Sequence, residues 1–71
     1  MFKVFVGRVV SNHEGDFKSV RYGTMATTEL EAELYFSRIE GFVRVAGVTK
    51  AKPGEAALLN LTTEGEVRPL F

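Results

Sequence analysis

The chain has 71 residues, no cysteine, and equal numbers of basic and acidic side chains, nine Lys and Arg against nine Asp and Glu. A chain of this length forms at most one domain and buries only about 60% of the surface that it exposes when unfolded. The lack of cysteine excludes disulfides, thiolate metal sites and a cysteine nucleophile. The neutral net charge leaves little repulsion between copies of the chain, which favours self-association.

The N-terminal apolar run is too short for a secretory signal. Gly7 and Arg8 break it before it reaches the length of a signal-peptide core. No stretch of the sequence is long and apolar enough to cross a membrane. A cytoplasmic protein is therefore expected.

Residues 2–10 are predicted to form an interior strand, because apolar side chains occupy both of its alternating faces. Residues 11–16 carry turn-forming side chains, with Gly15 available for a positive φ. A hairpin is expected, with residues 17–26 as its second strand. One face of that strand carries Val20, Tyr22, Thr24 and Ala26.

Residues 29–40 are predicted to form a helix. Thr28 and Glu31 have the spacing of a capping box, in which the Thr28 hydroxyl accepts a hydrogen bond from the Glu31 amide. Gly41 suits the left-handed conformation that follows a last helical turn. The helical period places four apolar residues on the face expected to pack on the sheet: Ala32, Tyr35, Phe36 and Ile39.

The remaining third of the chain is predicted to add strands. Residues 42–49 are strand-like, Pro53 and Gly54 have the order of a type II turn, and residues 56–62 supply the next strand. A short strand at 67–71 is expected at a sheet edge, because Pro69 cannot donate a ladder hydrogen bond.

The predicted fold is α+β, a single small domain over residues 1–71. One antiparallel sheet of four to five strands carries one packed helix, in the order β-β-α-β-β-(β). This element order is similar to that of many small phage-borne and mobile-element proteins, some of which inhibit host defence complexes by occluding a surface. The resemblance covers element order alone and implies an accessory protein that acts by contact, without transferring any functional residue.

A second apolar stripe on the predicted helix is a candidate partner-binding surface. Leu30 and Leu34 lie one turn apart, nearly opposite the sheet-facing stripe, so one sheet cannot cover both stripes. Either the two leucines are simply exposed, as single apolar residues often are, or they contact another chain. The surrounding segment is acidic, since residues 26–41 contain four Glu and one Arg, a net charge of −3. The residues assigned to this surface are Leu30, Leu34, Glu29, Glu33 and Arg38.

No catalytic, cofactor or metal site is predicted. The only histidine, His13, lies in the expected hairpin turn, which is a poor site for nucleophilic catalysis. With Glu14 and Asp16 it matches no zinc or EF-hand spacing. Phosphate-binding glycine motifs are absent. The chain is therefore expected not to be an enzyme and to have no cofactor and no small-molecule substrate.

Single-stranded nucleic acid is the alternative partner. Basic side chains alternate with aromatic ones in the predicted strands, and such a sheet face can neutralise phosphates and stack bases. The basic residues assigned to it are Lys3, Arg8, Lys18, Arg21 and Arg44. The neutral overall charge and the lack of an RNP-type motif favour protein as the partner instead.

The sequence thus favours a small non-enzymatic binding or regulatory protein that acts through protein–protein contact. Its partner is expected to be another protein or a second copy of itself, as a homodimer, with no membrane contact. A structural subunit of a larger assembly is a further alternative.

Overall fold

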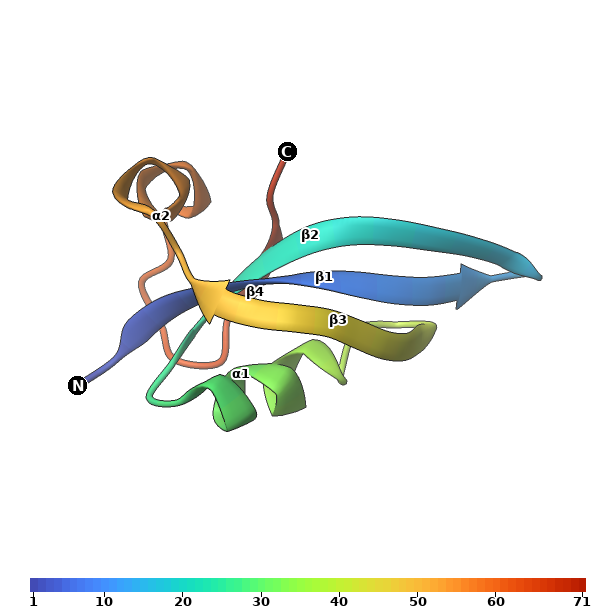
Figure 1. Ribbon diagram of the computed structural model, residues 1–71, viewed down its shortest axis with the longest axis horizontal. Helices are drawn as coiled ribbons and strands as arrows, with labels where there is room; N and C mark the ends of the chain where they lie inside the picture. Colours follow the sequence, from blue (N-terminus) through green and yellow to red (C-terminus); the bar gives the residue numbers. More distant parts are fainter.

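The computed structural model describes residues 1–71 and contains one antiparallel sheet with a helix on each face (Figure 1). In chain order the elements are β1 (Lys3–His13), β2 (Asp16–Ala26), α1 (Glu29–Phe36), β3 (Phe42–Lys50), α2 (Pro53–Leu59) and β4 (Val67–Pro69). The four strands lie side by side as β3-β1-β2-β4. The predicted α+β class and antiparallel sheet are confirmed, and the predicted order is wrong only at residues 56–62, where a helix replaces the expected strand.

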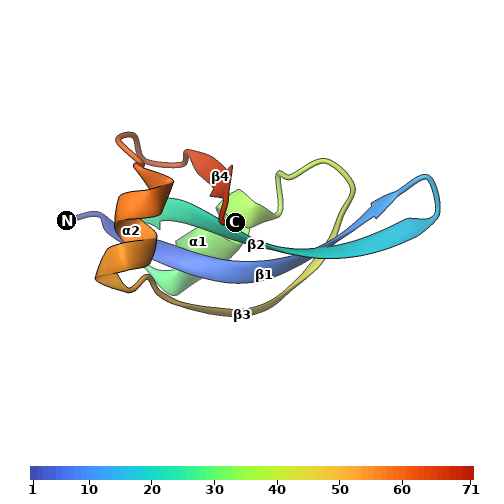
Figure 2. The same cartoon turned by 90° about the horizontal axis from the view of Figure 1, so that it is seen from above.

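The β1–β2 hairpin is the longest feature of the fold. Its ladder runs from the Lys3–Ala26 pair to the His13–Asp16 pair, and β3 pairs with the other edge of β1, which confirms β1 as an interior strand. Glu14 (φ 55°) and Gly15 (φ 88°) connect the strands. Two successive positive φ angles are typical of the type I′ turn, whose twist matches that of the strands. The distal part of the hairpin extends beyond both helices as an arm (Figure 2).

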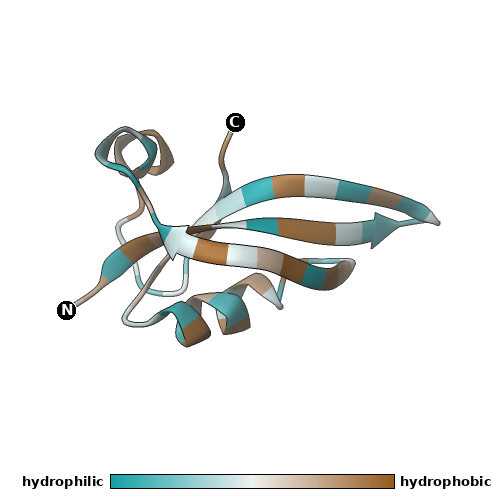
Figure 3. Ribbon diagram, in the orientation of Figure 1, coloured by the Kyte–Doolittle hydropathy of each residue, from teal (hydrophilic) through white to brown (hydrophobic).

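Two small cores lie on opposite faces of the sheet, because successive side chains of a strand point to opposite sides. The alternation is visible as apolar and polar bands along the strands (Figure 3). The first core, under α1, contains Phe5, Val9, Ala26, Ala32 and Phe36. The second, under α2, contains Val6, Leu59 and Leu70.

Helix α1 begins where the sequence predicts and ends four residues earlier. The Thr28 hydroxyl accepts from the Glu31 amide at 3.1 Å, as a capping residue does. After Phe36 the chain tightens, because the Arg38 and Ile39 amides donate to carbonyls only three residues back. The predicted end at residue 40 was therefore wrong, whereas Gly41 has the expected positive φ of 77°.

Helix α2 replaces the strand predicted at 56–62. Pro53 occupies the first helical turn, where its missing N–H costs nothing, and the Glu55 carboxylate accepts from the Lys52 amide at 3.0 Å. Asn60 closes the helix in the left-handed conformation. The type II turn expected at Pro53-Gly54 is in fact a helix start, so the order is β-β-α-β-α-β. Neither α1 nor α2 is long and apolar enough to cross a membrane.

Strand β3 is irregular where it passes β1. The register shifts between Gly7 and Arg8 and again between Val10 and Ser11. Gly47, with a φ of 78°, is the extra residue at the first shift. It is a β-bulge, a feature that a glycine inside a strand often marks.

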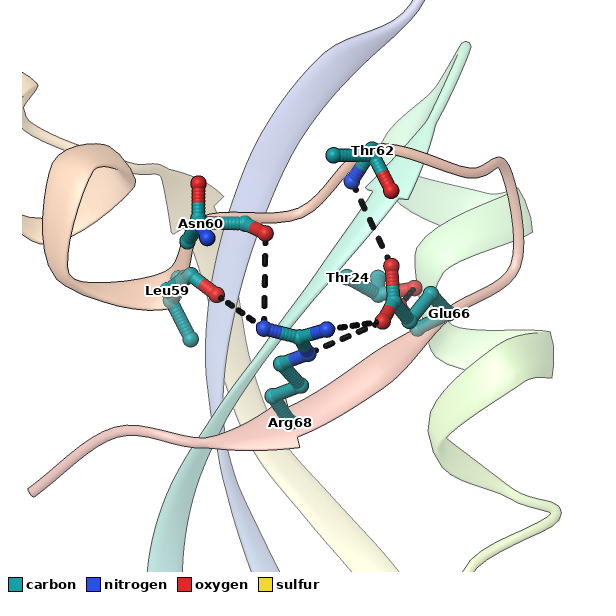
Figure 4. A network of polar contacts seen from close by, with 6 residues as sticks. All are labelled: Thr24, Leu59, Asn60, Thr62, Glu66 and Arg68. Atoms are coloured by element: carbon teal, nitrogen blue, oxygen red, sulfur yellow. Dashed lines mark hydrogen bonds and ion pairs between the residues drawn. The ribbon is translucent and has the colours of Figure 1, made fainter.

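Strand β4 lies at the edge of the sheet, as Pro69 predicts. It is tied to the end of α2 by Arg68, whose guanidinium donates to the carbonyls of Leu59 (3.2 Å) and Asn60 (3.4 Å) and pairs with Glu66 at 2.6 Å (Figure 4). The Glu66 carbonyl accepts from the Thr24 hydroxyl at 2.9 Å. This network fixes the C-terminal segment against the sheet.

Candidate functional site

Helix α1 presents two leucines to solvent. Leu30 is 68% exposed and Leu34 is 58% exposed, whereas Ala32 and Phe36 on the opposite side of the same helix are fully buried. The predicted orientation of both stripes is therefore confirmed. We call Leu30, Leu34, Glu29 and Glu33 the α1 ridge.

The glutamates of α1 divide into two kinds. Glu31 is used by the fold, because its carboxylate accepts from the Thr27 amide at 2.8 Å and the Thr27 hydroxyl at 3.0 Å. The hydrogen bond from the Thr27 backbone amide is the main cause that lowers the pKa of Glu31 below its ordinary value. Glu29 and Glu33 are exposed and form no salt bridge, so their charge is available on the α1 ridge.

Arg38 is separated from the other residues assigned to the partner surface. It lies beyond the end of α1, and its guanidinium carbon is 5.3 Å from the centroid of the Tyr35 ring, a cation–π distance. Burial, followed by the hydrogen bond to Glu64 at 3.1 Å, raises the pKa of Tyr35. The early end of α1 therefore turns Arg38 toward an aromatic side chain.

A hollow of about 320 Å³ opens beside Tyr35, between the end of α1, β2 and the segment before β4. It is open to solvent and partly apolar, with Tyr22, Tyr35, Arg38, Ile39, Gly65 and Val67 in its walls. No local sequence signal indicates this hollow, because it depends on where the segment after α2 returns to the sheet.

The sheet face opposite α1 is only partly covered. Helix α2 crosses one end of this face and leaves the part toward the arm without a helix (Figure 2). Arg8 and Arg21 are directly opposite one another across the β1–β2 pair, and Arg44 of β3 is opposite Val10, two residues further along the same face. Three of the five predicted basic residues are thus brought together.

Lys3 and Lys18, the other two predicted basic residues, lie on the α1 side of the sheet. Lys3 pairs with Ala26, a residue of the core under α1. Lys18 pairs with Ser11, whose side chain lies on the same face of β1 as that of the core residue Val9. The predicted basic surface is therefore split between two faces.

Only one of the aromatic residues predicted to accompany the basic ones lies on the uncovered face. Phe17 pairs with Asn12 on that face and is 65% exposed. Phe5, Tyr22 and Phe42 instead pack in or against the core under α1. We call Arg8, Arg21, Arg44 and Phe17 the open face.

The charges of the open face are only partly balanced. Arg21 forms a salt bridge with Glu55 of α2, and the pKa of Glu55 is lowered first by the Lys52 amide and then by Arg21. Arg8 donates to the Ser19 hydroxyl at 3.4 Å and has no carboxylate partner, and Arg44 has none either. Two uncompensated guanidinium groups therefore remain.

The hairpin tip shows no metal-binding arrangement. His13, Glu14 and Asp16 are exposed, and no group of three His, Asp or Glu side chains in the chain is placed to hold a metal ion.

No protein-family model, no curated protein and no solved structure matches this chain. The α1 ridge and the open face are the two candidate interaction surfaces of the chain.

Proposed function

We propose that this protein is a non-enzymatic accessory or regulatory protein of the cytoplasm that binds another protein through the α1 ridge. The observation that carries the proposal is the exposure of Leu30 and Leu34, one turn apart, on a helix whose opposite side buries Ala32 and Phe36. Because α1 is already fixed to the sheet, a partner can bind it without an additional cost of ordering the helix.

The chemistry of the ridge defines the partner surface. Leu30 and Leu34 supply two apolar anchors at helical spacing, which suits a helix that binds in a groove. Glu29 and Glu33 beside them carry unpaired negative charge. The complementary surface is an apolar groove with a basic rim, on a different protein or on a second copy of this chain.

Two acidic ridges placed directly against each other would bring four carboxylates together. Like charges across an interface oppose association. A homodimer through this helix therefore requires another surface of the second copy to receive the ridge.

The test compares Leu30→Lys plus Leu34→Lys with Leu58→Lys. Leu58 is a matched control, because it is a 73% exposed leucine on the other helix. Sedimentation over a range of concentrations measures self-association, and capture by the tagged chain from its native host, with the captured protein then purified and titrated, measures binding of another protein. We expect the parent chain and the control to form a complex that the double variant fails to form. Indistinguishable behaviour of all three proteins in both measurements would exclude the ridge.

Binding of single-stranded nucleic acid is a second candidate function. One specific observation favours it, the placement of Arg8, Arg21 and Arg44 on one uncovered sheet face. Lys3 and Lys18, which the sequence also suggested, do not contribute to that face.

A further inference from the structure

The open face has an excess of positive charge that the chain itself does not balance. Arg8 and Arg21 are direct cross-strand neighbours, and like charges in such positions destabilise a sheet. Glu55 neutralises Arg21 alone. A bound anion would relieve the repulsion and compensate Arg8 and Arg44.

A shallow hollow of about 200 Å³ lies on the open face beside Arg8 and Arg21 and does not include Arg44 in its wall. Arg8 and Arg21 form part of its wall, and Gly47 and Thr49 of β3 form another part. A Cβ at Gly47 would meet nothing within 4 Å, so the bulge leaves this region open. The hollow can admit a phosphate group next to two guanidinium groups, which are good phosphate donors.

Phe17 adds an aromatic surface on the same face. It is opposite Asn12, four residues along β1 from Arg8, which corresponds to about 13 Å of strand. A large exposed aromatic ring on the same face as arginines is the combination that single-strand binding proteins use, with bases stacked on the ring and phosphates on the basic groups.

We propose that the open face binds a short stretch of single-stranded nucleic acid, with Arg8 and Arg44 contacting phosphates and Phe17 stacking on a base. A single strand suits this face better than a duplex, because stacking on Phe17 requires an accessible base. The open face and the α1 ridge are on opposite sides of the sheet, so this proposal and the proposed protein contact stand or fall separately.

The first measurement is fluorescence anisotropy of a labelled oligo(dT) 20-mer and a labelled oligo(U) 20-mer, with the full chain at several salt concentrations. Two phosphate contacts on a single strand correspond to a slope of about −1.4 in log K against log salt. The affinity is therefore expected to fall about sevenfold between 50 and 200 mM salt.

The second measurement compares variants of equal charge change. Arg8→Gln plus Arg44→Gln should weaken binding at least tenfold and remove most of the salt dependence. Lys3→Gln plus Lys18→Gln removes the same charge from the α1 side and should change affinity less than twofold. Phe17→Ala should weaken binding about tenfold without changing the salt slope. All five side chains are exposed, and circular dichroism checks that each variant remains folded.

Three results would overturn the proposal. The first is that the parent chain fails to bind either oligonucleotide at 50 mM salt. The second is that the lysine variant loses as much affinity as the arginine variant. The third is that sedimentation shows self-association that only Arg8→Gln plus Arg44→Gln abolishes, which would assign the open face to a second copy of the chain.

Discussion

Leu59 of α2 lies directly over Gly23 of β2, and its Cδ2 atom is 2.8 Å from the position that a Cβ at residue 23 would take. The missing side chain at Gly23 allows α2 to approach the sheet. Leu59 then packs with Val6 and Leu70 in the second core. The position of α2, and with it the extent of the open face, depends on this contact.

Gly23→Ala is expected to lower the free energy of unfolding by about 1–3 kcal/mol, because the added methyl group overlaps Leu59. Urea denaturation measures the change. Gly54→Ala is the matched control, since a Cβ there would meet nothing within 4 Å and the residue lies in the first turn of α2. The control should be neutral or more stable, by up to about 1 kcal/mol. Equal destabilisation by both changes would contradict this account of how α2 packs.

The same contact explains why the sequence did not predict α2. Residues 56–59 form a short apolar run whose period does not separate helix from strand, and Pro53-Gly54 suits a turn as well as a helix start. A helix is favoured over a strand here by the contact of Leu59 with Gly23, which is 36 positions earlier in the chain. The β1–β2 hairpin and the start of α1 could be predicted because their signals are local: Gly15 in the turn and Thr28 at the cap.

Thr28→Ala is expected to lower the free energy of unfolding by about 1 kcal/mol, because the Glu31 amide loses its acceptor at the start of an eight-residue helix. Thr28→Ser keeps the hydroxyl and should retain most of the stability. Thermal unfolding of the two variants beside the parent chain makes the comparison. Equal melting temperatures for the alanine and serine variants would show that the cap contributes little.

The two candidate surfaces differ in how far the sequence could predict them. The α1 ridge follows from the helical period alone, and its exposure is as expected. The open face depends on which strand neighbours which. The tight hairpin turn already sets Arg8 opposite Arg21, but only the bulged pairing of β3 with β1 places Arg44 beside them. Strand alternation separates Lys3 from Arg8 and Lys18 from Arg21, so the prediction of a single face for all five basic residues was wrong.

Arg68→Met tests the link between β4 and the end of α2. Methionine keeps much of the aliphatic length and removes the donors to the Leu59 and Asn60 carbonyls. Since the Arg68 side chain is partly exposed, water replaces some of these bonds, and a loss of about 1 kcal/mol is expected. Chemical denaturation measures it, with Arg44→Met as the control that removes an exposed arginine without a salt bridge. A loss no larger than that of the control would assign Arg68 no structural role.

Acid is expected to destabilise the fold through three glutamates. The pKa values of Glu31, Glu55 and Glu66 are lowered from 4.5, each chiefly by a backbone amide that donates to the carboxylate. The unfolded chain therefore binds protons more readily than the folded one as the pH falls. The stabilisation is fully present above the unfolded value of 4.5 and is lost as the pH falls through the lower folded values.

Glu31→Gln isolates one of these contributions. The glutamine oxygen can still accept from the Thr27 amide, but it carries no charge that acid can remove. The variant should be less stable than the parent chain near pH 7 and should approach it near pH 3, so its stability changes less with pH. Urea midpoints measured across this range give both curves. Glu29→Gln is the control for the loss of one negative charge, at an exposed glutamate that accepts no hydrogen bond from the chain. A Glu31→Gln curve that runs parallel to the parent would show that the Thr27–Glu31 hydrogen bond does not couple folding to pH.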